Sequence, residues 1–529
     1  MRAPFSRTLS DLLEELAAQH ADHLAVIADD GEYSYAALAA RAGRLAAGLR
    51  ARGVRRGDRV GILATNRIEW LEICFGASAA GAVVVPISTW SKPAELAFII
   101  DDAAIGMLFA MASVANEDFV AGLRSIRPHV PSLHTLVMVG SEAPDDQWLR
   151  YDDLFAAQDC LLAPGDRPSA ADDALILYTS GTTSKPKAVR LKHYGLIENG
   201  FNIGERQKLR PVDRVLAAVP LFWAYGSANL LPASFTHAAT IVLQDRFEPS
   251  RALELIERYR CTVIYTLPAM TSALIADPKF AAERTRTLRT GLTIGNSQDI
   301  INAADVLGAR EICNIYGSSE TYGNCCVTPA EWPLERRATC QGPPLPGVSL
   351  RLVSPDGGAI RELGEDGQIE VSGYLMPGYG GQSASHNATV FTPDGWYRTG
   401  DIGRLTESGD LVFQGRNSEM IKRSGINVSP AEVEDLLMQH GDVAEAAVVG
   451  APDPDRGEII VAFVVRRRDS TITASELEAH CRALASRYKV PDRIKFLDLL
   501  PVTSTGKVQR QALKADDQAL AEPEAHDVA

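Results

Sequence analysis

The sequence predicts an α/β protein with a large N-terminal domain, built from layered α/β subdomains and a β-rich subdomain, and a small α+β C-terminal domain. Three observations support this fold class. Short apolar runs rich in β-branched residues alternate with amphipathic stretches through the first four hundred residues. A stretch rich in Gly, Pro and Asp comes next, and beyond it two helix-start signals accompany one strand-like run. Alternating strands and helices favour parallel sheets covered by helices.

Four apolar runs in the first part of the chain have the length and composition of buried strands. They occupy residues 59–64, 82–87, 239–243 and 261–267. Between the first two, residues 70–80 are apolar and rich in small side chains. This is expected of a crossover helix that is buried against a parallel sheet. We therefore expect parallel sheets with helices packed on them in the N-terminal domain.

From about residue 340 to about residue 410 the composition changes to Gly, Pro and Asp between short strand-like runs. Segments such as GGAIRELGEDGQIEVSG and PDGWYRTGDIGRLTESGDLVFQG are typical of β-hairpins and turns. We expect a β-rich subdomain here. It completes the large domain, which we place at residues 1–415.

The remaining residues, 416–529, predict a small separate α+β domain. Residues 429–432 form a capping-box pattern with Pro at the first helical position, and residues 473–476 repeat the box. Between these two helix starts, residues 459–465 form a strand-like run. The tail at residues 515–529 is acidic, contains Pro and is poor in large apolar groups, so we expect it to be disordered.

The composition excludes several classes of protein. The chain has 529 residues, 46% of them hydrophobic, which suffices for a sizeable core and two or more domains. With 53 basic and 67 acidic residues the net charge is -14, which speaks against a nucleic-acid surface. Eight cysteines show no metal-ligand spacing, and no apolar run reaches membrane-spanning length. We expect a soluble cytoplasmic protein with no nucleic-acid or membrane partner.

A polar loop directly follows the strand-like run at residues 174–178 and has the composition of an anion site. It reads TSGTTSKPK from Thr179 to Lys187. Its hydroxyl and backbone N–H groups can donate to phosphate oxygens, Gly181 lets the backbone approach closely, and two lysines supply positive charge. The pattern G-x-x-x-x-G-K-[ST] is absent from it, which argues against a nucleotide kinase or GTPase. Taken alone, the loop could equally be a solvated turn.

Read as YTSGTTSKPKA, residues 178–188 resemble the signature of the acyl-adenylate-forming superfamily, which includes acyl-CoA synthetases, luciferases and peptide-synthetase adenylation domains. Further matches follow in the order of that family and extend the resemblance over nearly the whole chain. They are PLF with Gly226 at 220–226, YGSSE at 316–320, YRTGD at 397–401, GR at 415–416 leading into residues 422–430, and STGK ending at Lys507. The chain most resembles a stand-alone acyl-CoA synthetase, an AMP-forming acid–thiol ligase.

The resemblance implies a nucleotide site. Tyr316 would lie against adenine, and Asp401 would bind the ribose hydroxyls with help from Arg416. Glu320 would hold the Mg²⁺ that bridges the ATP phosphates. The alternatives are a core tyrosine, a surface glutamate and a simple Asp–Arg salt bridge. The other implied nucleotide-binding residues are Thr179, Ser180, Gly181, Thr182, Thr183, Lys187, Gly295, Asn296, Ser297, Asn314, Gly317, Ser318 and Ser319.

The resemblance also implies two half-reactions at one site. A carboxylate attacks the α-phosphate of ATP to give acyl-AMP and pyrophosphate, and the thiol of CoA then attacks the acyl carbonyl and expels AMP. Lys507 would stabilise the charge that develops in the first step, an effect typically worth ~3–4 kcal/mol. The mobile small domain would pivot at Glu419, where Asp is more usual, and bring Lys422, Ser424 and Gly425 to the CoA side. A solvated lysine and an ordinary loop glutamate are the alternatives.

Two glycines usual in the family's phosphate loop are replaced, by Ser184 and Ala188. A side chain at such a position can clash with phosphate or forbid a positive φ, at a cost of about 1 kcal/mol or more. ATP-dependent adenylation would then be weak or absent, and the chain would thioesterify a supplied acyl-adenylate. This hypothesis is the alternative to the full two-step reaction.

The predicted acid pocket lacks a charge for an amino-acid substrate. Trp223 follows Phe222, where peptide-synthetase domains place Asp. An apolar aryl, alicyclic or polycyclic carboxylic acid would suit the aromatic and small residues of this region, although plain core packing explains them equally well. These residues are Phe222, Trp223, Tyr225, Gly226, Tyr322 and Gly323.

The acceptor thiol and functions of other classes stay open. No carrier-protein segment follows Lys507, so CoA is the expected acceptor and a separate carrier protein the second candidate. A luciferase-like oxygenase shares the motifs. A silent nucleotide-binding protein would need Tyr316 and Asp401 but not Lys507, whose presence counts against it. The sequence does not fix the oligomeric state, and a homodimer is one option.

Overall fold

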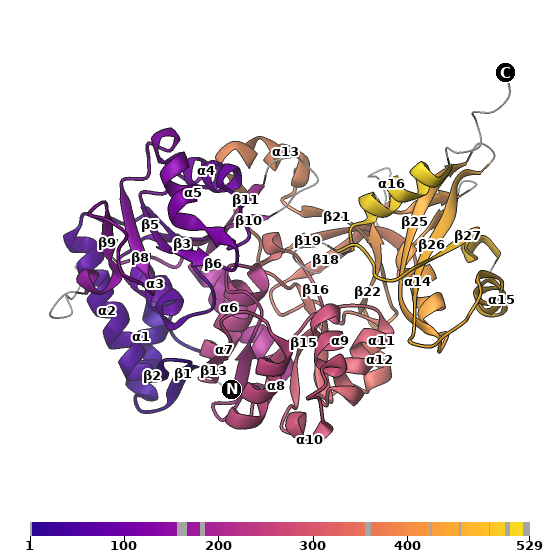
Figure 1. Cartoon of the computed structure of the whole chain (residues 1–529), viewed down its shortest axis with the longest axis horizontal. Coiled ribbons are helices and arrows are strands. Elements are labelled where there is room, and N and C mark those ends of the chain that lie inside the picture. Colours follow the sequence, from indigo (N-terminus) through magenta and orange to yellow (C-terminus); the bar gives the residue numbers. More distant parts are fainter. Residues whose placement is uncertain are drawn as a thin grey trace.

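The chain forms a large N-terminal domain and a smaller C-terminal domain (Figure 1). The structure is a computed structural model. It describes residues 3–155, 167–179, 186–354, 361–417, 419–423, 426–453, 456–485, 487–502 and 508–521. Helices and strands are mixed in both domains, so the predicted α/β fold class is confirmed. The exact domain boundary at residues 415 and 416 stays a prediction.

One eight-stranded sheet contains the strand that ends at Tyr316. Its inner strands are parallel, and the pair at each edge, β1 with β2 and β16 with β17, is antiparallel. In spatial order the strands are β17 (Cys326–Val327), β16 (Glu311–Tyr316), β15 (Thr290–Thr293), β14 (Val263–Tyr265), β12 (Arg214–Ala217), β13 (Thr240–Leu243), β1 (Leu24–Ala28) and β2 (Gly31–Ser34).

A second eight-stranded sheet contains the hairpin of the predicted phosphate loop. This hairpin, β10 with β11, and the pairing of β11 with β20 are antiparallel, while the other pairs are parallel. In spatial order the strands are β20 (Tyr379–Gly380), β11 (Lys187–Lys192), β10 (Asp173–Thr179), β4 (Val83–Pro86), β3 (Arg59–Leu63), β5 (Met107–Met111), β8 (Thr135–Val139) and β9 (Trp148–Arg150). The four predicted strands are β3, β4, β13 and β14, so the expected parallel sheets are confirmed.

Helix α3 (Ile68–Ala79) is the buried crossover helix predicted at residues 70–80. Its Trp70 and Phe75 are buried in a core that takes side chains from strands of both sheets. Helices α1 (Leu9–Gln19) and α2 (Tyr35–Ala51) pack against it. The other described α-helices of this domain are α4 (Pro93–Asp102), α5 (Phe119–Ile126), α6 (His193–Gln207), α7 (Leu231–Thr236), α8 (Pro249–Tyr259), α9 (Pro268–Ala276), α10 (Ala282–Thr285), α11 (Ser297–Ile301), α12 (Leu334–Thr339) and α13 (Asn387–Val390).

The predicted β-rich subdomain is a four-stranded antiparallel sheet. Its strands, in both spatial and chain order, are β18 (Ser349–Val353), β19 (Asp366–Ser372), β21 (Tyr397–Leu405) and β22 (Leu411–Arg416). In the turn between the last two, Gly409 has a φ of 78°, a left-handed conformation that glycine adopts at little cost. The predicted hairpins are therefore confirmed, and the last of them brings Asp401 beside Arg416.

The small domain is built on a five-stranded sheet. Its strands are β23 (Ile421–Arg423), β24 (Ile426–Val428), β25 (Val443–Asp453), β26 (Gly457–Arg466) and β27 (Arg493–Leu497), and its helices are α14 (Pro430–Met438), α15 (Ala474–Leu484) and α16 (Arg510–Ala521). The hydroxyl of Ser429 accepts from the N–H of Glu432 at the start of α14, and Thr473 forms a full capping box with Glu476 at the start of α15. Both predicted helix starts are confirmed.

The expectation of a disordered tail is wrong for residues 515–521, because α16 continues through them. Leu513 is fully buried against the sheet of the small domain. Asp517 lies 2.9 Å from Arg493 and 2.7 Å from Lys495, both on β27. These contacts outweigh the acidic composition of the segment, and residues 522–529 lie outside the described part of the chain.

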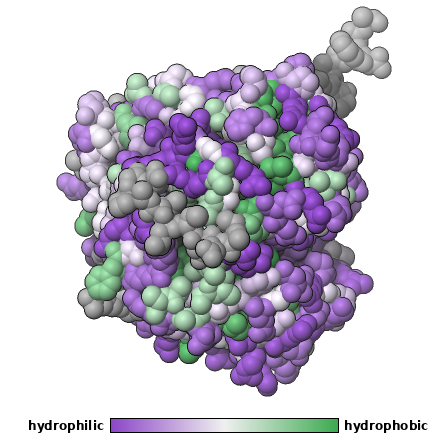
Figure 2. Space-filling model, turned by 90° about the vertical axis from the view of Figure 1, so that its left-hand side faces the viewer, coloured by the Kyte–Doolittle hydropathy of each residue, from purple (hydrophilic) through white to green (hydrophobic). Residues whose placement is uncertain are grey.

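The face of the large domain seen in Figure 2 is mostly hydrophilic, with apolar side chains scattered singly or in small groups. Among the helices that the structure describes, none combines the length and the apolarity needed to span a bilayer.

Candidate active site

Tyr316, Asp401 and Arg416 form one cluster between the first large sheet and the β-rich subdomain, in which the tyrosine and the aspartate are buried and the arginine side chain is half exposed. Tyr316 ends β16, and its hydroxyl donates to Oδ2 of Asp401 over 2.7 Å. Arg416 pairs with Asp401 across β21 and β22, with its Nε 3.1 Å from Oδ1. Asp401 is 6% exposed, and its Oδ1 accepts no hydrogen bond from the described residues. The predicted adenosine-binding residues are therefore together.

Burial governs the protonation of this cluster. It raises the pKa of the Asp401 carboxyl above its ordinary value, although the Arg416 charge and the hydrogen bond from Tyr316 act in the opposite direction. Burial and the neighbouring Asp401 charge raise the pKa of Tyr316, so its phenol remains a hydrogen-bond donor. Phe413 on β22 lies against the same tyrosine, with ring centroids 5.6 Å apart.

Glu320 lies in the short helical turn that follows Tyr316 and is 9% exposed. The hydroxyl of Tyr379 donates to its Oε1 over 2.7 Å. The ammonium of Lys187 lies over the ring of the same tyrosine, 5.4 Å from the centroid. Tyr379 therefore joins the predicted Mg²⁺ ligand to a lysine of the predicted phosphate loop, a connection that the motifs do not contain.

The predicted phosphate loop connects β10 and β11. Thr179 and Lys187 pair at its base, and the hydroxyl of Tyr178 donates to Oδ2 of Asp102 over 2.7 Å. The turn itself lies outside the described residues; it contains Ser180, Gly181, Thr182, Thr183 and Ser184. The predicted strand before the loop is confirmed as β10, whereas the strand after it, β11, was not predicted from the sequence.

Ala188 does not disturb this hairpin in the way expected from its place in the motif. It pairs with Tyr178 and Gly380 in the sheet, has no positive φ, and its methyl group is buried in the core beside β11. Its N–H donates to the hydroxyl of Ser383 over 3.1 Å. Because Ala188 needs no positive φ and its methyl group is buried, this residue gives no reason to expect weak adenylation.

The predicted adenine-side segment is fixed by its own hydrogen bonds. Gly295 has a φ of 145°, and a side chain there would collide with Asp299. Asn296 caps α11, and the hydroxyl of Ser297 donates to the carbonyl of Ala338 over 2.9 Å. Asn314 is fully buried, and its amide donates to two main-chain carbonyls, so its side chain holds the fold in this conformation.

The YGSSE segment turns tightly after Tyr316. A side chain at Gly317 would lie 2.3 Å from the carbonyl oxygen of Gly323, so only glycine fits this close approach. The N–H of Ser318 donates to the Thr321 hydroxyl over 3.0 Å. Ser319 begins the short helical turn that contains Glu320. These contacts set the direction in which Glu320 leaves the strand.

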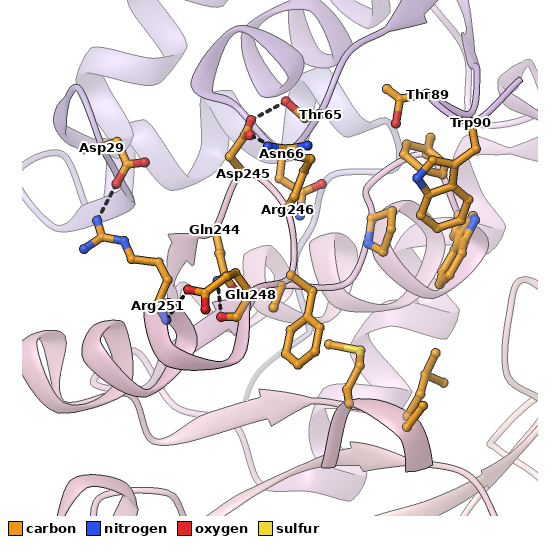
Figure 3. Close-up of a pocket in the computed structure, with 18 residues that line it drawn as sticks. Asp29, Thr65, Asn66, Thr89, Trp90, Gln244, Asp245, Arg246, Glu248 and Arg251 are labelled. Atoms are coloured by element: carbon orange, nitrogen blue, oxygen red, sulfur yellow. Dashed lines mark hydrogen bonds and ion pairs between the residues drawn. The ribbon is translucent and has the colours of Figure 1, made fainter. Parts of the chain in front are cut away.

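A pocket of about 600 Å³ opens where parallel strands of the two large sheets end (Figure 3). Trp90 follows β4, and Phe222 and Trp223 follow β12; the three rings meet edge to face with centroids 5.1 to 6.0 Å apart. Figure 3 shows Trp90 on one side of the pocket and Arg251 with Asp29 on the opposite side. A crevice at the carboxyl ends of parallel strands is a common ligand site in α/β folds.

Asn66 holds the two sheets together beside this pocket. Its amide donates to the carbonyls of Ala217 and Val219 and accepts from the N–H of Leu221. Neither Asn66 nor Trp90 was predicted as a site residue, although each lies in the loop that follows a strand of the second sheet. Their position after a predicted parallel strand could have identified them, because ligand sites are common at the carboxyl ends of such strands.

The other four predicted pocket residues do not line this pocket. Tyr322 is fully buried with a φ of 57°, and its hydroxyl accepts from the N–H of Lys192. The hydroxyl of Tyr225 donates to the carbonyl of Leu292 over 2.7 Å. A side chain at Gly226 or at Gly323 would lie 2.3 Å from a neighbouring atom. The structure therefore favours the packing alternative for these residues.

The predicted pivot, Glu419, is held by the small domain. Its carboxylate lies 3.3 Å from Nε of Arg510, the first residue of α16. The backbone N–H of Lys422 donates to Oε2 of Glu458 over 2.6 Å, and the Lys422 side chain is exposed. The remaining predicted residues of the small domain lie outside the described residues; they are Ser424, Gly425 and Lys507.

Fold and site together are those of the class of adenylate-forming enzymes: a two-domain α/β chain in which a buried tyrosine contacts an aspartate and a glutamate lies in the turn that follows the tyrosine. The chain belongs to the AMP-binding enzyme family. That family matches residues 13–380, and its C-terminal domain matches residues 432–507.

Among the relatives, an indoleacetate–CoA ligase of Aromatoleum aromaticum is 32% identical over 96% of this chain and 97% of its own length. The mitochondrial medium-chain acyl-CoA ligase ACSF2 of Mus musculus is 29% identical, over 96% of this chain and 87% of its own length. Because these relatives are named acyl-CoA ligases, the chain is an enzyme of that class.

Two solved structures share the fold. The anthranilate CoA ligase AuaEII in complex with anthranoyl-AMP superposes with a TM-score of 0.88 at 28% identity, over 98% of this chain and 100% of that chain. ATP-bound MatB from Rhodopseudomonas palustris superposes with a TM-score of 0.85 at 28% identity, over 97% of this chain and 99% of that chain. ATP and an acyl-AMP are thus ligands of close structural neighbours.

Proposed function

We propose that the chain activates an apolar carboxylic acid as its acyl-adenylate and transfers the acyl group to CoA. The proposed substrates are aryl, alicyclic or polycyclic carboxylic acids. The observation that supports this choice is the aromatic pocket wall of Trp90, Phe222 and Trp223. Flat rings offer a large apolar contact area to an apolar acid. The indoleacetate and anthranilate ligases among the relatives also have aryl acids in their names.

The proposed acid pocket and the cluster of Tyr316, Asp401 and Arg416 both lie where parallel strands of the first large sheet end. Leu267 and Met270 line the pocket just beyond β14, and Tyr316 ends β16. Only β15 separates these strands, so their ends are on the order of 10 Å apart. An acid in the pocket could therefore direct its carboxylate toward a nucleotide held at Tyr316.

Tyr316, Asp401 and Arg416 would hold the adenosine of ATP. Oδ1 of Asp401 is a buried acceptor with no hydrogen bond from the described residues, which fits a ribose hydroxyl as donor. Arg416 would keep Asp401 ionised and would itself be shared with the nucleotide.

Glu320 fits a Mg²⁺ site of the kind that substrate phosphates complete. Its carboxylate supplies the hard oxygen ligand that Mg²⁺ prefers. Within the described ranges, no group of three or more His, Cys, Asp or Glu side chains is placed to hold a metal. That agrees with an ion bound by one carboxylate, phosphate oxygens and water. When bound, the ion would offset phosphate charge during attack by the acid.

Lys507 would stabilise the adenylation transition state, and Glu419 would be the pivot about which the small domain alternates. Both roles rest on the motif positions, together with the contact between Glu419 and Arg510. CoA as acceptor and a cytoplasmic location belong to the same proposal. A separate carrier protein remains the second candidate for the acceptor.

A panel of acids tests the proposed function. Purified protein with Mg-ATP and CoA is given aryl, alicyclic, polycyclic, short-chain and amino acids, and CoA-thioester formation is measured by mass spectrometry. We expect one of the first three groups to react at least tenfold faster than the last two, measured as kcat/KM. Preference for an amino acid or a short aliphatic acid would contradict the proposed substrate class.

The same panel, given as synthetic acyl-adenylates, separates the alternative in which the ATP step is weak. That alternative now depends on Ser184, because Ala188 occupies an ordinary strand position. Fast thioester formation from acyl-adenylates, with negligible pyrophosphate release from ATP and the same acids, would favour it over the two-step reaction.

A further inference from the structure

Tyr379 lies at the point where three parts of the candidate site meet. It begins β20, the edge strand next to the phosphate-loop hairpin, and pairs with Val189 on β11. Its side chain is buried, with 3% of the residue exposed. The YGSSE turn lies on its other side, because the N–H of Met376 donates to the carbonyl of Glu320 over 2.9 Å. This segment therefore spans from the phosphate loop to the predicted Mg²⁺ ligand.

The backbone of Tyr379 is fixed by a single side chain. The N–H of Tyr379 donates to Oδ1 of Asn387 over 2.8 Å, and its carbonyl accepts from Nδ2 of Asn387 over 3.2 Å. These paired hydrogen bonds supplement the short β20 ladder, which is only two residues long. Because its backbone is held at both polar groups, the Tyr379 side chain starts from a fixed position.

The side chain of Tyr379 contacts two predicted site residues at once. Its hydroxyl donates to Oε1 of Glu320 over 2.7 Å, and its ring lies below the ammonium of Lys187. A phenol carries its proton at neutral pH and a carboxylate is only an acceptor, so the Tyr379 hydroxyl donates to Glu320 in this contact. One carboxylate oxygen of Glu320 is thus directed by the tyrosine.

We propose that Tyr379 is a positioning residue for the ATP-dependent half-reaction. Its hydroxyl orients the Glu320 carboxylate for Mg²⁺, and its ring holds the Lys187 ammonium for phosphate. This proposal rests on the proposed adenylation function. It adds a residue that belongs to none of the motifs used to predict the site. Transfer to CoA uses neither Mg²⁺ nor the β- and γ-phosphates, so Tyr379 affects the first half-reaction and leaves the second unchanged.

The variant Tyr379→Phe removes the hydroxyl and keeps the ring. Binding of a non-hydrolysable ATP analogue is measured by calorimetry over a range of Mg²⁺ concentrations, in the absence of any acid. Loss of a hydrogen bond to a charged ligand typically weakens the dependent equilibrium about tenfold or more. We expect the Mg²⁺ concentration for half-maximal binding to rise about tenfold, with thioester formation from a synthetic acyl-adenylate within about twofold of wild type.

A second variant, Tyr379→Leu, also removes the ring. Because an exposed cation–π contact is worth a factor of about two to five, analogue binding at saturating Mg²⁺ should weaken by about that factor, whereas Tyr379→Phe should not change it. Thermal unfolding of both variants reports any general loss of stability.

Tyr151→Phe is the matched control. Tyr151 donates to Glu72 over 2.6 Å, also in a buried Tyr–Glu pair of the large domain, but it lies on the outer edge of the second sheet. Its loss should lower stability and leave the Mg²⁺ dependence of nucleotide binding at the wild-type value. A wild-type Mg²⁺ dependence in Tyr379→Phe would overturn the proposal. So would an equal loss in both half-reactions, which would indicate a purely structural role.

The binding experiment is independent of the acid. If no acid yields a CoA thioester with the wild-type protein, the proposed function fails. The Mg²⁺ dependence of analogue binding then still decides whether Tyr379 positions Glu320.

Discussion

The hydroxyl of Tyr316 lies 2.7 Å from Oδ2 of Asp401 and joins the end of β16 in the large parallel sheet to β21 in the β-rich subdomain. The two residues are 85 positions apart in the sequence. Their contact brings together two of the predicted nucleotide-binding residues, and it places the Asp401 carboxylate between a neutral donor and the Arg416 guanidinium. The site is therefore assembled where two subdomains meet, as ligand sites frequently are.

Replacement of Asp401 by Asn should weaken nucleotide binding. The variant keeps the shape of the side chain but loses the charge that pairs with Arg416 and that would accept a hydrogen bond from a ribose hydroxyl. We expect the Kd for ATP, measured by calorimetry, to rise about 10- to 100-fold. Asp366→Asn is the control, since Asp366 pairs with Arg404 in the same sheet but is half exposed. An unchanged Kd in Asp401→Asn would exclude the ribose role.

Replacement of Trp223 by Ala should affect the acid and not ATP. The change removes one of the three rings of the pocket wall. We expect the KM for the best apolar acid to rise about tenfold or more, because a large apolar contact is lost. The KM for ATP should remain within about twofold of the wild-type value. The reason is that Trp223 lines the acid pocket and is not part of the cluster formed by Tyr316, Asp401 and Arg416. Equal rises in both constants would contradict the assignment of this pocket to the acid.

Tyr322→Phe tests the packing alternative for the buried aromatic beside the YGSSE turn. The N–H of Lys192 would lose the acceptor that the Tyr322 hydroxyl provides. We expect the free energy of unfolding to fall by about 1–2 kcal/mol in urea titrations. The acid KM should stay at the wild-type value. A large change in acid preference with unchanged stability would indicate instead that Tyr322 contacts the acid.

The contact between α11 and α14 predicts that stability depends on pH. Burial, and then the charges of Glu434, Asp299 and Glu432, raise the pKa of Asp435 to about 7. A carboxyl whose pKa is raised by folding binds its proton more tightly in the folded state. Its favourable contribution is therefore complete below its unfolded value of about 4 and is lost as the pH rises through about 7.

Asp435→Asn removes this titration. We expect the Tm at pH 8 to rise by about 2 to 4 °C, and the gain to shrink as the pH falls and to vanish near pH 4. The negative charges of two neighbouring residues are each paired with a cation in the wild-type protein: Glu432 with Lys489 and Glu434 with Arg510. Asp442→Asn, an exposed acid of the same domain, is the control. A gain that is equal at pH 5 and pH 8 would rule out ionisation of Asp435 as the cause.

Local patterns account for what could be predicted from the sequence. The strands at residues 59–64 and 82–87, the crossover helix between them and the two capped helices of the small domain follow from hydrophobic period and capping chemistry. Tyr316 and Asp401 were placed in one site by motif resemblance, and they are in contact.

Long-range packing accounts for what could not be predicted. The role of Trp90 depends on the way strands of two sheets end side by side, and the role of Tyr379 depends on an edge strand that pairs with β11 from far along the chain. Tyr322 was expected in the pocket, but its left-handed backbone turns the ring into the core. Tertiary contacts also keep residues 515–521 helical despite their acidic composition.

Oxygen transfer from the acid to AMP distinguishes the proposed acyl-adenylate route from other routes to the thioester. In acyl-adenylate chemistry the attacking carboxylate oxygen remains on phosphorus when the thiol expels AMP. The preferred acid, labelled with ¹⁸O in its carboxyl group, is incubated with the protein, Mg-ATP and CoA, and the products are analysed by mass spectrometry. We expect acyl-CoA, AMP that carries one labelled oxygen, and unlabelled pyrophosphate. Formation of ADP and labelled phosphate, or of unlabelled AMP, would contradict the acyl-adenylate route.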